Sequence, residues 1–166
     1  KVVKVYDGDT CTINIVDNHI LKQYSLRLYG IDSPEMKPLK SQKNRLVEKE
    51  YAKTSKKALS ALILNKIVII DFEKKEKYGR HMGTIFLLQN NNPNMKWVNV
   101  NKWMVQEKYA IKYDGNKKIS FSQRNFKKKF TGIVPSESYM ENWMTSIVPG
   151  SHFLQNDSDS ENSSDQ

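Results

Sequence analysis

The first 28 residues alternate apolar and polar side chains with a period of two, and this pattern constrains the fold more than any other feature. Such alternation, in segments rich in Val, Ile, Thr and Tyr, is typical of β-strands with one buried face. It occurs in residues 2–6, 10–16 and 20–28, and turn-forming pairs at 7–8 and 17–18 separate these segments. The pattern therefore predicts a three-stranded meander.

Further along the chain, the period changes to that of a helix. In residues 46–64, a row of Ala, Leu and Ile residues shares one face, which predicts an amphipathic helix. A second helix is expected over residues 98–107. The predicted inward side chains are Ala58, Leu59, Leu62 and Ile63 in the first helix, and Val100, Trp103, Met104 and Val105 in the second.

Between and after these helices, the sequence predicts shorter elements. Residues 67–72 indicate a buried strand, and residues 82–88 indicate another. The asparagine-rich run at residues 90–94, which contains Pro93, predicts a loop.

Beyond Gly115, residues 121–130 predict a basic helix and residues 136–147 a further one. The polar end of the chain has too little apolar surface to fold. We therefore expect one domain over residues 1–148 and a disordered, acidic Ser/Asp-rich tail over residues 149–166. The expected class is α+β, a five-stranded Greek-key barrel of the OB-fold type packed with about three helices.

Charge is unevenly distributed along the 166 residues. The chain carries +9 overall, but residues 151–166 hold four acids and no Lys or Arg, which leaves +13 on residues 1–150. Such a basic body would attract nucleic acid, although lysines that only solvate surface helices give the same count. No apolar run is long enough to cross a bilayer, and the lone Cys11 excludes an internal disulfide.

Two aspartates are the candidate ligands of a cation. Asp9 follows the turn at residues 7–8, and Asp32 follows the third predicted strand, so folding could bring the two strand ends together. Paired carboxylates suit Ca²⁺ or Mg²⁺, which prefer oxygen ligands. Taken singly, the first cluster is also typical of a hairpin turn, and the second of a helix cap or Asx-turn before Pro34.

Two arginines extend this interpretation. Arg27 lies on the third predicted strand, and Arg80 follows Gly79 in a predicted loop. A guanidinium is a planar fork that remains charged and holds two phosphate oxygens. Two of them would stabilise the charge that builds on a phosphorus under attack. Alternatively, Arg27 forms a surface salt bridge and the Gly79 segment is an ordinary turn.

In this order and spacing, the clusters resemble those of the staphylococcal nuclease (thermonuclease) family. The pieces that resemble it are residues 7–10, Arg27 with residues 32–35, residues 77–83 and residues 100–101, within a match from Val2 to Tyr113. The sequence departs from the family in a longer segment at residues 89–97 and in Lys108 and Tyr109, which stand where the family tends to have a glycine turn.

The resemblance implies a role for each matching residue. Asp9 and Asp32 would be Ca²⁺ ligands together with the backbone carbonyl of Ser33, and Asp7 would orient water on the metal from the second shell. Glu35 would be the general base or would position the attacking water. Arg27 and Arg80 would clamp the phosphate, and the substrate would be contacted by Lys77, Tyr78 and Tyr113.

The resemblance thus implies a Ca²⁺-dependent, sugar-nonspecific endonuclease that cleaves DNA and RNA and leaves 3′-phosphate ends. Single-stranded or locally open substrate, a monomer and no membrane association are expected. One alternative is a catalytically inactive nucleic-acid-binding module of the same fold, and another is a protein-interaction domain. Location stays open: secreted or at the cell envelope if a signal peptide was removed, otherwise intracellular.

Overall fold

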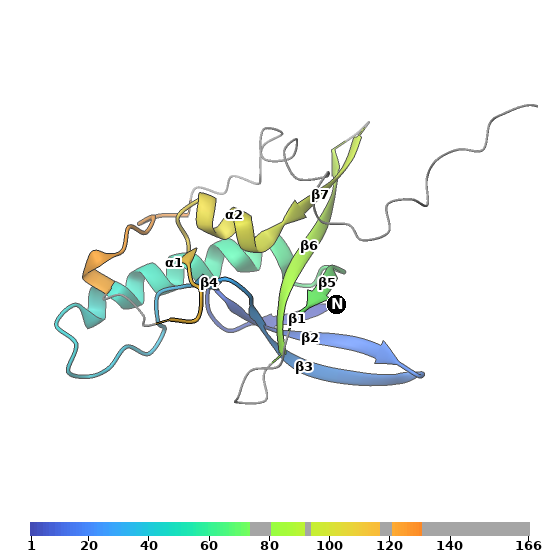
Figure 1. Ribbon diagram of the computed structural model, residues 1–166, viewed down its shortest axis with the longest axis horizontal. Helices are drawn as coiled ribbons and strands as arrows, with labels where there is room; N and C mark the ends of the chain where they lie inside the picture. Colours follow the sequence, from blue (N-terminus) through green and yellow to red (C-terminus); the bar gives the residue numbers. More distant parts are fainter. Residues whose placement is uncertain (74–80, 92–93, 117–120, 131–166) are drawn as a thin grey trace, which may run out of the picture.

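The computed structural model describes residues 1–73, 81–91, 94–116 and 121–130, which form a mixed α+β fold (Figure 1). Figure 1 shows α1 and α2 beside each other, with β2 and β3 extending from them as a long hairpin. The elements are β1 (Val2–Val5), β2 (Thr10–Asp17), β3 (Ile20–Leu28), β4 (Ile31–Asp32), α1 (Arg45–Ile63), β5 (Ile69–Phe72), β6 (His81–Asn91), β7 (Asn94–Asn99), α2 (Val100–Gln106), β8 (Ile111–Lys112) and a 3₁₀ turn, η1 (Phe121–Gln123).

The six-stranded sheet has the order β1-β2-β3-β6-β5, with β7 also paired to β6. The predicted meander is confirmed, because β1, β2 and β3 form consecutive antiparallel pairs. In contrast, β3 and β6 are parallel, with Arg27 opposite Met82. A separate two-stranded ladder joins β4 to β8 and pairs Asp32 with Ile111. These long-range pairings bring the ends of β3, β4 and β6 to one region.

The α+β class is confirmed, but the described residues form an open six-stranded sheet with two α-helices, and not the expected five-stranded closed barrel with about three helices. The outer strands of the sheet, β1 and β5, are not paired with each other. Val2 instead exchanges backbone hydrogen bonds with Asn65 and Lys66, each of 2.9 Å. Because these contacts end before β5 begins at Ile69, no ladder joins the two outer strands.

The two predicted helices are confirmed, whereas the basic helix expected over residues 121–130 is wrong. That segment forms only the single 3₁₀ turn η1. Its backbone bonds to other elements: the Lys127 N–H donates to the Lys108 carbonyl at 2.8 Å, and the Lys128 carbonyl accepts from the Thr54 hydroxyl at 3.2 Å. A backbone held by those partners is not available for helical bonds. The helix predicted over residues 136–147 and the tail at 149–166 lie outside the described residues.

Two shorter predictions are also corrected. The asparagine-rich loop expected over residues 90–94 is largely sheet, because β6 runs to Asn91 and β7 starts at Asn94 opposite it. Pairing along six positions of β6 overrides the low strand propensity of asparagine. The strand β5 was expected to be buried, yet Ile69 is 54% exposed and Phe72 46% exposed, since β5 is an outer strand.

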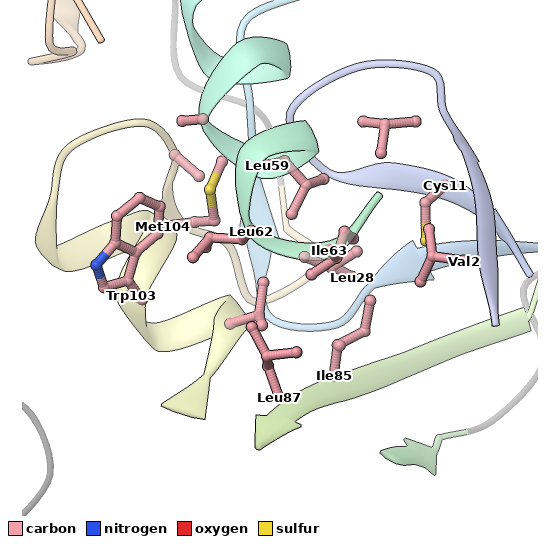
Figure 2. Close-up of a cluster of buried hydrophobic side chains, with 14 of the residues drawn as sticks. Val2, Cys11, Leu28, Leu59, Leu62, Ile63, Ile85, Leu87, Trp103 and Met104 are labelled. Atoms are coloured by element: carbon pink, nitrogen blue, oxygen red, sulfur yellow. The ribbon is translucent and has the colours of Figure 1, made fainter. Parts of the chain in front are cut away.

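The hydrophobic core lies between the helices and the sheet (Figure 2). Figure 2 shows Leu59, Leu62 and Ile63 of α1 among the side chains of Leu28 and Ile85. The predicted inward residues of α1 are all buried, as are Val100, Trp103 and Met104 of α2, whereas Val105 is half-buried. None of the helices in the described ranges combines the length and apolar character needed to span a membrane.

The C-terminal end of α2 explains one departure from the family pattern. Lys108 has a φ of +60°, the left-handed conformation that glycine adopts without strain. The following N–H groups, of Tyr109 and Ala110, donate to the Met104 carbonyl at 2.8 and 2.9 Å. The chain therefore makes the glycine-type turn expected here with a lysine.

Candidate functional site

The turn between β1 and β2 places the first two aspartates. The Tyr6 N–H donates to the Thr10 carbonyl at 2.9 Å, and the Asp9 N–H donates to Asp7 Oδ1 at 3.1 Å. Asp7 therefore holds the backbone of Asp9 rather than facing solvent. Both side chains are buried, whereas an ordinary hairpin turn would leave such an acid exposed to solvent.

A single guanidinium joins Asp9 to Asp32. Arg27 lies near the end of β3, opposite Thr10 in the ladder with β2. Its Nη1 is 3.0 Å from Asp9 Oδ1, and its Nη2 is 3.0 Å from Asp32 Oδ1. The exposed fractions of the three side chains are 12%, 3% and 1% for Arg27, Asp9 and Asp32. The two carboxylates thus share one guanidinium, and the salt bridges of Arg27 are buried rather than on the surface.

The negative charge of these acids is only partly compensated. The pKa of Asp9 is raised to about 7, first by burial and next by the charge of Asp7. Arg27 and the Ser33 N–H oppose this rise. A carboxyl that resists ionisation despite a neighbouring arginine lies where a further cation would be stabilised. Buried oxygen donors with uncompensated charge fit a hard divalent cation.

The loop after β4 carries the third candidate acid, Glu35, just beyond a peptide that is bonded to Asp9. The Ser33 N–H donates to Asp9 Oδ2 at 2.8 Å, so this peptide is fixed on the carboxylate. Pro34 is fully buried, and Glu35, the next residue, is exposed. The solvent-exposed carboxylate of Glu35 thus lies two residues after Ser33, whose peptide N–H is bonded to Asp9.

Arg124 is a site residue that the sequence analysis missed. Its Nη1 is 2.8 Å from Asp32 Oδ2, and its side chain is 5% exposed. The two oxygens of Asp32 are therefore each bonded to a guanidinium, from Arg27 and from Arg124. Arg124 follows η1 and is 92 residues away from Asp32 in the chain. No local pattern predicts this contact, because no motif surrounds Arg124.

Asn101 is a second residue whose role emerges only from the fold. Its Nδ2 donates to the carbonyls of Tyr29 and Gly83, and its Oδ1 accepts from the Ile85 N–H at 3.1 Å. The buried amide of α2 thereby links the segment after β3 to β6. The residue belonged to one of the family-like clusters, but the sequence assigned it no function.

The proposed substrate residues are placed only in part. Tyr113 donates its backbone N–H to the Gly30 carbonyl at 3.0 Å and lines a cavity of about 930 Å³. The same cavity is lined by Asp32, Lys112 and Arg124, so it adjoins the aspartate site. Arg80, Lys77 and Tyr78 lie outside the described residues.

The side chains near Asp9 and Asp32 restrict how a metal ion could be bound. Among the described residues, no group of three or more His, Cys, Asp or Glu side chains could hold a metal ion. A calcium ion takes six to eight oxygen ligands. One bound to Asp9 and Asp32 would therefore take its other ligands from backbone carbonyls, water and substrate.

The fold and the site define a class of protein: an α+β domain in which two buried carboxylates share one arginine and a second arginine contacts one of them. The chain belongs to the staphylococcal nuclease homologue family, whose match covers residues 25–130. This confirms the resemblance seen in the sequence. The matched range starts after Asp9 and extends past Tyr113 to include Arg124.

Individual relatives include two that carry nuclease names. An uncharacterized protein of Methanocaldococcus jannaschii is 31% identical over 135 residues, which is 70% of this chain and 59% of that protein. An uncharacterized endonuclease of Escherichia coli O157:H7 is 29% identical over 109 residues, 66% of this chain and 61% of its own. A thermonuclease of Staphylococcus hyicus is 37% identical over 90 residues, covering 52% and 47%. The chain thus spans about three fifths of the first two relatives and under half of the third.

Proposed function

We propose that this chain is a Ca²⁺-dependent, sugar-nonspecific endonuclease. It would hydrolyse phosphodiester bonds of DNA and RNA by attack of an activated water and leave 3′-phosphate ends. The observation that carries the proposal is the Arg27 guanidinium, 3.0 Å from both Asp9 and Asp32. The thermonuclease and endonuclease names of distant relatives support it.

In this proposal Asp9 and Asp32 hold the calcium ion, and the backbone carbonyl of Ser33 contributes a further oxygen. Bound there, the ion would supply Lewis-acid stabilisation to a phosphate oxygen. Asp7 supports the ligand set by accepting the Asp9 N–H at 3.1 Å, which fixes the Asp9 backbone. The raised pKa of Asp9 supports cation binding, because the carboxylate lacks full compensation without it.

Arg27 and Arg80 bind the phosphate and stabilise the charge that develops on its oxygens. Arg27 already lies between the two carboxylates, where a phosphate would meet a cation held by them. In comparable sites, loss of one such preorganised donor costs about 10²–10³ in rate. Lys77, Tyr78 and Tyr113 would contact the substrate alongside the cavity at Asp32.

Glu35 accepts the proton that the attacking water loses. Its side chain is exposed, so water reaches it directly, and the N–H of Ser33, two residues earlier, is bonded to Asp9. A general base needs this combination of reach and fixed position.

We propose the domain boundaries that the sequence predicts. Residues 1–148 would form one nuclease domain, and residues 149–166 an acidic tail. The domain would act as a monomer on single-stranded or locally open nucleic acid, consistent with the +13 charge of residues 1–150.

Digestion of a plasmid and of single-stranded DNA in Ca²⁺, in EGTA and in Mg²⁺ tests the proposal. We expect cleavage in Ca²⁺ and its loss in EGTA. Glu35→Gln should lower the rate by about 10²–10⁴-fold, as for loss of a general base, while DNA binding is retained. A protein that shifts DNA in a gel but cleaves nothing in Ca²⁺ would instead be an inactive binding module.

A further inference from the structure

A buried carboxylate near the site has no role in the proposed chemistry. Glu48 lies in the first turn of α1, and its exposed fraction is 3%. Glutamate is rarely buried to this degree without partners, because removal of its charge from water is costly. The contacts of Glu48 therefore identify what its burial achieves.

Both oxygens of Glu48 accept hydrogen bonds from one loop. Oε1 accepts the backbone N–H of Glu35 at 3.0 Å, and Oε2 accepts from the side-chain amide of Gln42. The two donors are neutral, and within the described residues no cation pairs with Glu48. Hydrogen bonds to an ionised acceptor are stronger than neutral ones, and the N-terminal turn of a helix stabilises the charge.

Together with the Asp9 contact, these hydrogen bonds hold the backbone from Ser33 to Glu35 in place. The Ser33 N–H is bonded to Asp9 at 2.8 Å, Pro34 is buried, and the Glu35 N–H is bonded to Glu48 at 3.0 Å. Two buried carboxylates thus hold a three-residue segment at its two ends, and proline restricts the residue between them. The backbone of Glu35 is fixed while its side chain remains exposed.

We propose that Glu48 is a positioning residue that directs Glu35 toward the reacting water. This inference rests on the proposed nuclease function. The helix α1 serves as the rigid support, since Leu59 and Ile63 anchor the other end of α1 in the core (Figures 1 and 2). Because a small displacement of a reacting group costs as much as about 10² in rate, a weakened anchor lowers kcat rather than substrate affinity.

The decisive comparison uses Glu48→Ala, Glu48→Gln and a control, Glu50→Ala. Glu50 lies two residues further along α1, is exposed, and forms an ion pair with Lys53 at 2.7 Å. We expect Glu48→Ala to lower kcat about 10–10²-fold with little change in KM. Glu48→Gln should recover part of the rate, because its amide oxygen still accepts the Glu35 N–H. Glu50→Ala should retain the wild-type rate.

A double-mutant cycle separates positioning from general stabilisation. If Glu48 acts through Glu35, Glu48→Ala should cost little further rate in a Glu35→Gln background. Additive losses, or an equal loss in Glu48→Ala and Glu50→Ala, would overturn the inference. Thermal midpoints of all variants identify any loss that follows from unfolding.

Hydrogen exchange of the Glu35 amide supplies a readout that does not depend on cleavage. It should accelerate at least about tenfold in Glu48→Ala, which corresponds to a loss of about 1.4 kcal/mol of local protection, and less in Glu48→Gln. Unchanged exchange would overturn the inference even in an active enzyme. If the wild type fails to cleave while its Glu35 amide is protected by Glu48, the proposed function fails and the anchoring stands. Should Glu48→Ala not fold, Glu48→Gln and Gln42→Ala provide the same comparison.

Discussion

At the scale of the residue, the site depends on how charges are shared among a few buried side chains. Asp32 contacts Arg27 with one oxygen and Arg124 with the other, at 3.0 and 2.8 Å. A carboxylate oxygen has two lone pairs, so these bonds leave capacity for a cation. The two positive charges nevertheless oppose the approach of a divalent ion.

Arg124→Met should therefore strengthen Ca²⁺ binding. Removal of a positive charge adjacent to Asp32 should raise the affinity about tenfold, equivalent to about 1.4 kcal/mol. Isothermal titration with CaCl₂ measures this in the absence of substrate. Lys129→Met removes the same charge from an exposed position of the same segment and should leave the affinity nearly unchanged. Weaker binding in Arg124→Met would indicate instead that Arg124 orients Asp32 for the metal.

At the scale of the element, tight packing between a turn and a helix holds the acids in place. A Cβ atom on Gly8 would lie 2.7 Å from the Cβ of Ser55 in α1 and 2.8 Å from that of Ser33, and would overlap the Ser55 hydroxyl. That hydroxyl donates to the Tyr109 carbonyl at 2.6 Å. Glycine is required at this position by space, since the turn presses directly against α1.

Gly8→Ala should thus destabilise the fold by about 1–3 kcal/mol, the usual cost of overpacking. Urea unfolding followed by tryptophan fluorescence gives the free energy of unfolding. Combination with Ser55→Ala removes the hydroxyl overlap and should recover part of the loss. Full stability of the single variant would show that the turn is not packed against α1 as described.

Elements with a strong local pattern could be predicted from the sequence, and those fixed by distant partners could not. The strands β1 to β3 and the helix α1 follow from periodicity alone. The strand β7 was missed because its pairing with β6 overrides its asparagine-rich start. Likewise, the approach of Asp9 and Asp32 was predicted from their places beside strand ends and from the family resemblance, whereas Arg124 and Glu48 had no motif to mark them.

At the scale of the whole molecule, net charge governs how the protein meets its substrate. Residues 1–150 carry +13, and the acidic residues of the last sixteen positions reduce the total to +9. Lysines that neutralise phosphates release counterions, so affinity depends on salt.

Binding of a single-stranded oligonucleotide in EGTA should weaken about tenfold or more when salt rises from about 50 to about 200 mM. Fluorescence anisotropy measures the Kd at each salt concentration without cleavage. A flat salt profile would contradict an electrostatic contact with the backbone and would favour a partner recognised by other means.

The central claim is that the buried carboxylates joined by Arg27 form a cation-dependent cleavage site. Asp32→Asn tests it most directly, with Asp17→Asn as the control, because Asp17 is 48% exposed and pairs with Lys22 at the far end of β2. In a time course with end-labelled single-stranded DNA and Ca²⁺, we predict that Asp32→Asn cleaves about 10²-fold or more slowly than the wild type. Asp17→Asn should cleave at nearly the wild-type rate. Cleavage by Asp32→Asn at the wild-type rate would contradict the account.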